Sequence, residues 1–183
     1  MKKGIRILAI DDSPYKKGDA SSLIIGVIGR ERTIEGVLSS KVAVDGSDSA
    51  QRIIKMLKSS RFPGQVALLA LNGITVAGLN LVNIVELNKR LEIPIMAVTR
   101  KKPRPAELAK AMKKWSPEYD EKARIMKDIR KNIVVERVGG YYVQSIGMDS
   151  ASVQMFIEKA AELLRLSHLI ASGVVRGESK GRL

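Results

Sequence analysis

The chain has 183 residues, of which 45% are hydrophobic, and this is enough for one domain with a substantial core. The absence of cysteine excludes disulfides, thiolate zinc sites and cysteine nucleophiles, and the single histidine excludes metal motifs that need two. Because 32 lysines and arginines oppose 19 acidic residues, the net charge is +13, which predicts a polyanionic partner such as DNA or RNA.

The chain opens with three predicted strands. Two are short apolar runs bounded by turn residues, Ile5–Ile10 and Leu23–Ile28, and the third, Thr33–Asp45, contains β-favouring valines. The first run is too short for the hydrophobic part of a signal peptide, so we expect a cytoplasmic protein.

Helices and strands alternate in the next part of the chain. The predicted elements are a helix capped by Ser47 or Asp48, a buried strand Val66–Leu71, a helix over Leu79–Leu87 and a strand Pro94–Val98. The region between Gln65 and Glu86 has no charge, but its asparagines and glycines favour a strand, a turn and a helix over a membrane span. The order predicts an α/β fold: a mixed sheet with three antiparallel strands, then β-α-β units, and flanking helices.

The second half of the chain is strongly basic. We expect helices over Pro103–Trp115 and Pro117–Arg130, a hairpin around Gly139-Gly140, a long helix through Leu164 and a loose tail from about Gly173. Between residues 100 and 137 there are 13 lysines and arginines and 6 acidic residues. Such a cluster favours contact with a phosphate backbone, and the alternative is an ordinary solvated helix surface.

Three of the predicted strands end on small polar residues with side-chain oxygens. Asp11 and Asp12 follow the first strand, Asp45 follows the third, and Asn72 follows the fourth. If these strands are neighbours with matched ends, the side chains meet at one edge of the sheet, where they could hold a divalent cation for phosphodiester hydrolysis. The alternative is that each residue only begins a turn or caps a helix.

The single histidine, His168, lies among apolar residues near the predicted end of a helix, which favours a packing or capping role over a catalytic one. The chain contains neither of the common glycine-rich nucleotide-binding motifs. Acidic side chains with a cation are therefore the remaining catalytic chemistry.

Several motifs resemble known nucleases. The strand end Ile10-Asp11-Asp12-Ser13 is similar to Val-Asp-x-Ser in endonuclease V, which has a ribonuclease H-like fold. Val44-Asp45-Gly46, the segment 71–78 and the segments 167–172 and 176–179 resemble the archaeal endonuclease dU-like family of unknown function. The resemblance covers nearly the whole chain and implies a single ribonuclease H-like domain over residues 1–183.

The resemblance also implies site residues. By their place in the motifs, Asp11, Asp45 and Asn72 correspond to the three carboxylates with which endonuclease V holds Mg²⁺ or Mn²⁺. Arg100 or its neighbour Lys101 corresponds to the basic residue that steadies the cleaved phosphate. Asp149 stands close to the place of a histidine of endonuclease V, either as an acidic ligand or as a helix N-cap.

These assignments imply a metal-dependent endonuclease that cleaves DNA or RNA, with a role in repair. Asn72 departs from the pattern, because its amide oxygen can ligate a cation but brings no negative charge. The Tyr-Ile-Pro wedge of endonuclease V is also missing. Two alternatives stay open: a nucleic-acid-binding module with weakened or lost catalysis, and a phosphotransfer enzyme acting on small molecules or nucleotides.

Overall fold

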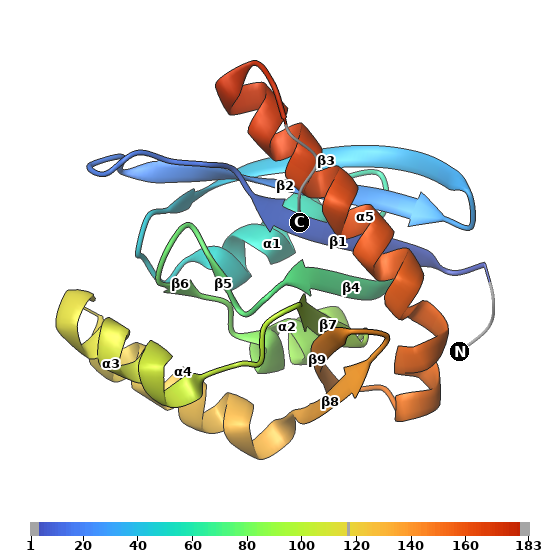
Figure 1. The fold of residues 1–183 in the computed structure, drawn as a ribbon. Coiled ribbons are helices and arrows are strands. Elements are labelled where there is room, and N and C mark those ends of the chain that lie inside the picture. Colours follow the sequence, from blue (N-terminus) through green and yellow to red (C-terminus); the bar gives the residue numbers. More distant parts are fainter. Residues whose placement is uncertain (1–3, 117, 180–183) are drawn as a thin grey trace.

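The structure is a computed structural model that describes residues 4–116 and 118–179. Its main strands are β1 (Arg6–Asp12), β2 (Ser21–Arg30), β3 (Thr33–Ala43), β4 (Val66–Asn72), β7 (Ile95–Thr99), β8 (Val134–Val138) and β9 (Tyr141–Ile146). They form one sheet in the order β3-β2-β1-β4-β7-β9-β8 (Figure 1). Two short strands, β5 (Thr75–Val76) and β6 (Asn80–Leu81), pair separately.

The sheet is mixed, as the sequence predicted. The strands β1, β2 and β3 pair antiparallel, whereas β1, β4 and β7 run parallel to one another. The strand β9 is antiparallel to β7, and β8 closes the edge as its hairpin partner. Because β1, β4 and β7 are parallel, their carboxyl ends lie at the same edge of the sheet.

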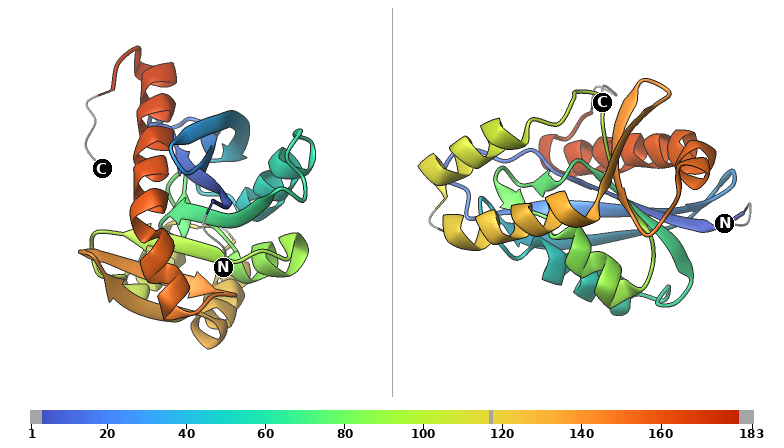
Figure 2. Two further views of the ribbon diagram at one scale, coloured as in Figure 1. Left: turned by 90° about the vertical axis from the view of Figure 1, so that its right-hand side faces the viewer. Right: turned by 90° about the horizontal axis from the view of Figure 1, so that it is seen from below.

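Helices cover both faces of the sheet. They are α1 (Ser49–Lys58), α2 (Ile84–Leu91), α3 (Pro105–Trp115), α4 (Tyr119–Asn132) and α5 (Ser150–Arg176). Figure 2 shows α5 on one side of the sheet, with α1 and α2 on the other. Each interface has its own apolar core, because alternate residues of β1 point to opposite faces: Ile7 and Ala9 toward α5, Leu8 and Ile10 toward α1 and α2. No helix among the described residues has the length and apolar character needed to cross a membrane.

The predicted helix over Leu79–Leu87 is wrong in its first part. Residues 75–81 form the β5–β6 hairpin, and α2 begins only at Ile84, where the side chain of Asn83 accepts a hydrogen bond from the Glu86 amide. The buried amide of Asn80 donates to the Ala43 carbonyl and to Asp48. These tertiary hydrogen bonds hold an extended backbone where the apolar spacing alone favoured a helix.

The last helix is longer than the sequence indicated. It passes through Gly173 and ends at Arg176, where Gly177 adopts a left-handed conformation that terminates helices readily. Residues 180–183 of the predicted loose tail lie outside the described residues, as does Pro117, the predicted first residue of the second basic helix.

Candidate functional site

Asp11 and Asn72 lie side by side at the carboxyl ends of β1 and β4. The parallel register pairs Ile10 with Leu71, so the next residue of each strand is also a neighbour. The amide nitrogen of Asn72 donates to Oδ1 of Asp11 over 3.1 Å. Two of the three predicted strand-end residues are therefore brought into direct contact.

His168 contacts the other oxygen of the Asp11 carboxylate. Its Nδ1 lies 2.9 Å from Oδ2 of Asp11, across 157 residues of sequence. The neighbouring Ser167 fixes the helix here, because its hydroxyl donates to the Ala9 carbonyl of β1 over 2.7 Å. The sequence favoured a packing or capping role for His168; in the structure one third of its side chain is exposed, and it pairs with Asp11.

The carboxyl group of Asp11 lies in an unusual electrostatic environment. Its side chain is only 3% exposed, and burial, followed by repulsion from Asp12, raises its pKa from 3.8 to about 6. The hydrogen bond from Asn72 and the proximity of His168 act in the opposite direction but do not cancel the increase. The fold therefore maintains a buried carboxylate at a cost in stability, and perturbed groups of this kind concentrate at functional sites.

Asp12 and Asp45 both form hydrogen bonds with the segment between β5 and β6. The amide of Ala77 donates to Oδ2 of Asp12, and its carbonyl accepts from the backbone amide of Asp45. Oδ1 of Asp45 accepts from the Leu79 amide over 2.8 Å. Asp45 thus reaches the same edge of the sheet as Asp12, and within the described part of the chain no hydrogen bond joins it to Asp11.

The backbone at Asp45 and in the segment between β5 and β6 takes conformations that favour glycine. Asp45 and Ala77 have φ values of +55° and +45°, and Gly78 has +84°. A β-carbon at Gly78 would overlap both the Asp45 carboxylate and the Tyr15 hydroxyl. Burial, Asp45 and Asp12 all raise the pKa of Tyr15, so its phenol stays a neutral hydrogen-bonding group beside the acids.

Lys122 anchors Asp45 from α4. Its side chain is fully buried, and Nζ donates to the Asp45 carbonyl over 2.6 Å and to the Ser116 hydroxyl over 2.8 Å. Burial lowers the pKa of this lysine. No pattern in the sequence distinguishes Lys122 from the solvated lysines around it.

Arg100 and Lys101 lie next to Asn72. All three line a pocket of about 400 Å³ together with Tyr141 and with Leu164 of α5. The Arg100 guanidinium lies 6.0 Å from the centre of the Tyr141 ring. The structure therefore brings the two predicted phosphate-binding residues to the same side of the sheet as Asp11.

Asp149 is not part of this constellation. Its carboxylate accepts a hydrogen bond from the Ser152 amide and caps the N-terminus of α5, which is the alternative role considered for it. His168 lies 19 residues further along the same helix, or roughly 28 Å at the helical rise. An acidic ligand from Asp149 is therefore excluded at the Asp11 carboxylate.

The side chains near Asp11 could supply only some of the ligands of a divalent cation, so water would have to supply the others. Among residues 4–116 and 118–179, no three histidine, aspartate or glutamate side chains are arranged to hold a metal ion by themselves. Mg²⁺ needs less, because it usually takes one or two carboxylates and keeps several waters. The Asp11 carboxylate and the amide oxygen of Asn72 are hard ligands of the required type, and water would complete the shell.

Comparison with known proteins places the chain in a family. Residues 3–175 match the family described as Endonuclease dU. The chain belongs to the Endonuclease dU family. A UPF0215 protein of Methanothermobacter thermautotrophicus is 34% identical over 99% of this chain and 93% of its own length. The family predicted from the motifs is therefore confirmed.

Solved structures extend the comparison to the fold. A protein of unknown function from Archaeoglobus fulgidus superposes with a TM-score of 0.84 at 29% identity, over 94% of this chain and 99% of the other. The catalytic domain of human endonuclease V gives a TM-score of 0.55 at 13% identity, over 95% and 83%. This Endonuclease dU family member therefore shares the fold of endonuclease V.

Proposed function

We propose that the protein is a nuclease that needs Mg²⁺ or Mn²⁺ and cleaves phosphodiester bonds of DNA or RNA in the cytoplasm. The observation that carries the proposal is the contact of the buried Asp11 with both Asn72 and His168, beside the pocket of Arg100 and Lys101. Membership of the Endonuclease dU family and the fold shared with endonuclease V support the same chemistry.

The proposal gives each side chain a role. Asp11 and Asn72 would hold the cation, with Asp45 contributing a second carboxylate from the neighbouring segment. A bound cation supplies an activated water and neutralises charge on the phosphate. His168, oriented through Nδ1 by Asp11, presents Nε2 to take a proton from the attacking water. Arg100 and Lys101 would bind the phosphate oxygens.

A cleavage assay tests the proposal. The protein is incubated with Mg²⁺ or Mn²⁺ and labelled DNA or RNA strands that contain uracil, inosine or a mismatch. We expect cleavage that Asp11→Asn abolishes and that Asp128→Asn retains, because Asn132 within α4 is the one hydrogen-bond partner of the Asp128 carboxylate among the described residues. Failure to cut any of these strands, or equal cutting by the Asp11 variant, would rule the proposal out.

A second function is supported by the hydrogen bonds around Asp11. Both of its oxygens are already engaged, and its neighbour is an amide where the family resemblance leads us to expect a carboxylate. These features favour a module that binds nucleic acid without cleaving it. Calorimetry with Mn²⁺ separates the two functions: binding that disappears in Asp11→Asn and Asp45→Asn supports the nuclease, whereas salt-sensitive strand binding without Mn²⁺ binding supports the module.

A further inference from the structure

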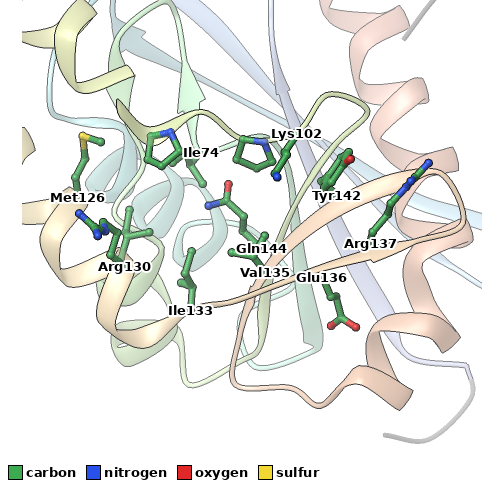
Figure 3. A pocket seen from close by; sticks show the side chains of 13 residues that line it. Ile74, Lys102, Met126, Arg130, Ile133, Val135, Glu136, Arg137, Tyr142 and Gln144 are labelled. Carbon is green, nitrogen blue, oxygen red and sulfur yellow. The ribbon is translucent and has the colours of Figure 1, made fainter. Parts of the chain in front are cut away.

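A second pocket lies on the other face of the sheet, between the β8–β9 hairpin, α4 and the segment that follows β7 (Figure 3). Its volume is about 410 Å³, within the range typical of small-molecule sites. Apolar side chains make up much of its wall, among them Ile74, Met126 and Val135. Such a wall suits the flat faces of an aromatic ring.

Gln144 gives the pocket a polar group that lacks a partner. Only 7% of the residue is exposed, and no described residue forms a hydrogen bond with its side-chain amide. Figure 3 shows this amide directed into the pocket, between Ile74 and Lys102. The amide reaches the open space of the pocket, so it is available to exchange hydrogen bonds with a ligand there. The edge of a nucleobase offers donors and acceptors in one plane, which matches an amide.

Three cations border the same pocket. The side chains of Lys102, Arg130 and Arg137 form no hydrogen bond or ion pair with any residue in the described ranges, and the Arg137 guanidinium lies 5.8 Å from the centre of the Tyr142 ring. The nearby Glu136 does not neutralise them at close range, because Figure 3 shows its carboxylate directed away from the pocket. The charge therefore favours an anionic group beside the apolar wall.

We propose that this pocket binds one nucleotide unit of a strand, with the base against the apolar wall, its edge on Gln144 and the phosphates on its two sides on Arg130 and Arg137, which Figure 3 shows at opposite ends of the pocket. The pocket adjoins the candidate active site, because Ile74 follows Asn72 by two residues and Lys102 follows Lys101. A strand held here would pass close to Asp11. The inference rests on the proposed function for a nucleic-acid partner, but it requires no cleavage.

Binding measured in EDTA tests the pocket separately from catalysis. Fluorescence anisotropy compares a labelled single strand with a strand of equal length whose residues are abasic. We expect the base-bearing strand to bind at least about tenfold more tightly, since stacking and edge contacts belong to the base. Gln144→Leu and Tyr142→Ala should remove this difference, whereas Gln51→Leu, on the exposed face of α1, should retain it.

Two further measurements complete the test. Arg130→Gln and Arg137→Gln should weaken both strands and lower the salt dependence of binding by about one charge each. Calorimetry with free adenosine monophosphate distinguishes a free nucleotide from a nucleotide within a strand. If the monophosphate binds and Gln144→Leu removes this binding, while base-bearing and abasic strands bind equally, the pocket is a site for free nucleotides. Equal affinity for base-bearing and abasic strands, together with no binding of the monophosphate, overturns the proposal. Base-dependent binding without cleavage would overturn only the proposed nuclease function and would support the proposed pocket.

Discussion

Replacement of Asp11 by asparagine should stabilise the protein in metal-free buffer at neutral pH. Burial raises the pKa of this carboxyl group from 3.8 to about 6, so the folded state carries its charge at a cost of about 3 kcal/mol above pH 6. An asparagine is neutral and nearly isosteric. Its oxygen can still accept from Asn72, and its amide can donate to a neutral Nδ1 of His168. The cost is removed while the hydrogen bonds are kept.

We therefore expect Asp11→Asn to raise the free energy of unfolding by about 1–3 kcal/mol at pH 7.5, and Tm by several degrees. The sign depends on pH. Because the folded pKa is raised, the folded state binds more protons than the unfolded state between about pH 4 and 6, so wild-type stability falls as pH rises through this window. Below pH 4 both states of the wild type are protonated, and the advantage of the variant should disappear.

Urea denaturation followed by circular dichroism, in EDTA at pH 4, 5, 6 and 7.5, measures this difference. Asp149→Asn is the matched control, because asparagine caps helices as well as aspartate does. The hydrogen bond from Ser152 lowers the pKa of Asp149, so any stability it adds is present at neutral pH and lost on acidification. A less stable Asp11 variant at pH 7.5, or a difference that does not change with pH, would refute this account of the Asp11 environment.

Four other variants probe the surroundings of Asp11. Lys122→Met should lower the free energy of unfolding by about 1–3 kcal/mol in a urea titration, because the Asp45 carbonyl loses its buried donor. Asn72→Asp places a second carboxylate at Asp11; we expect a lower Tm in EDTA and a rise on adding Mn²⁺ that exceeds the rise in wild type. Arg100→Gln and Lys101→Gln should each reduce the salt dependence of strand binding by about one charge, measured by anisotropy.

The strands were predictable because burial on both faces produces continuous apolar runs. Such a run fills β4, and the neighbouring β1 shows the same character until Asp11. Matched ends of parallel strands then suffice to predict the contact of Asp11 with Asn72. The β5–β6 hairpin could not be found in this way, because Asn80 holds it through partners more than 30 residues distant.

The roles of His168 and Lys122 could not be predicted from local sequence. Each depends on where a helix crosses the sheet or approaches a loop, at separations of 157 and 77 residues. One local signal was available for His168: the polar pair Ser167-His168 interrupts the apolar face of a long helix. For Lys122 there was none, since a lysine in a basic amphipathic helix is normally solvated.

The alternation of β1 explains why the acidic residues form two groups. Asp11 follows Ile7 and Ala9 toward α5 and meets His168, whereas Asp12 meets Ala77 on the segment that also holds Asp45. The two groups join only at the end of β1, where repulsion between the adjacent carboxylates contributes to the raised pKa of Asp11. A cation at this junction would relieve that repulsion and draw on both groups. Because position 72 is an asparagine, the group around Asp11 has one negative charge fewer than it would have with a carboxylate there. We therefore expect this group to bind a cation weakly.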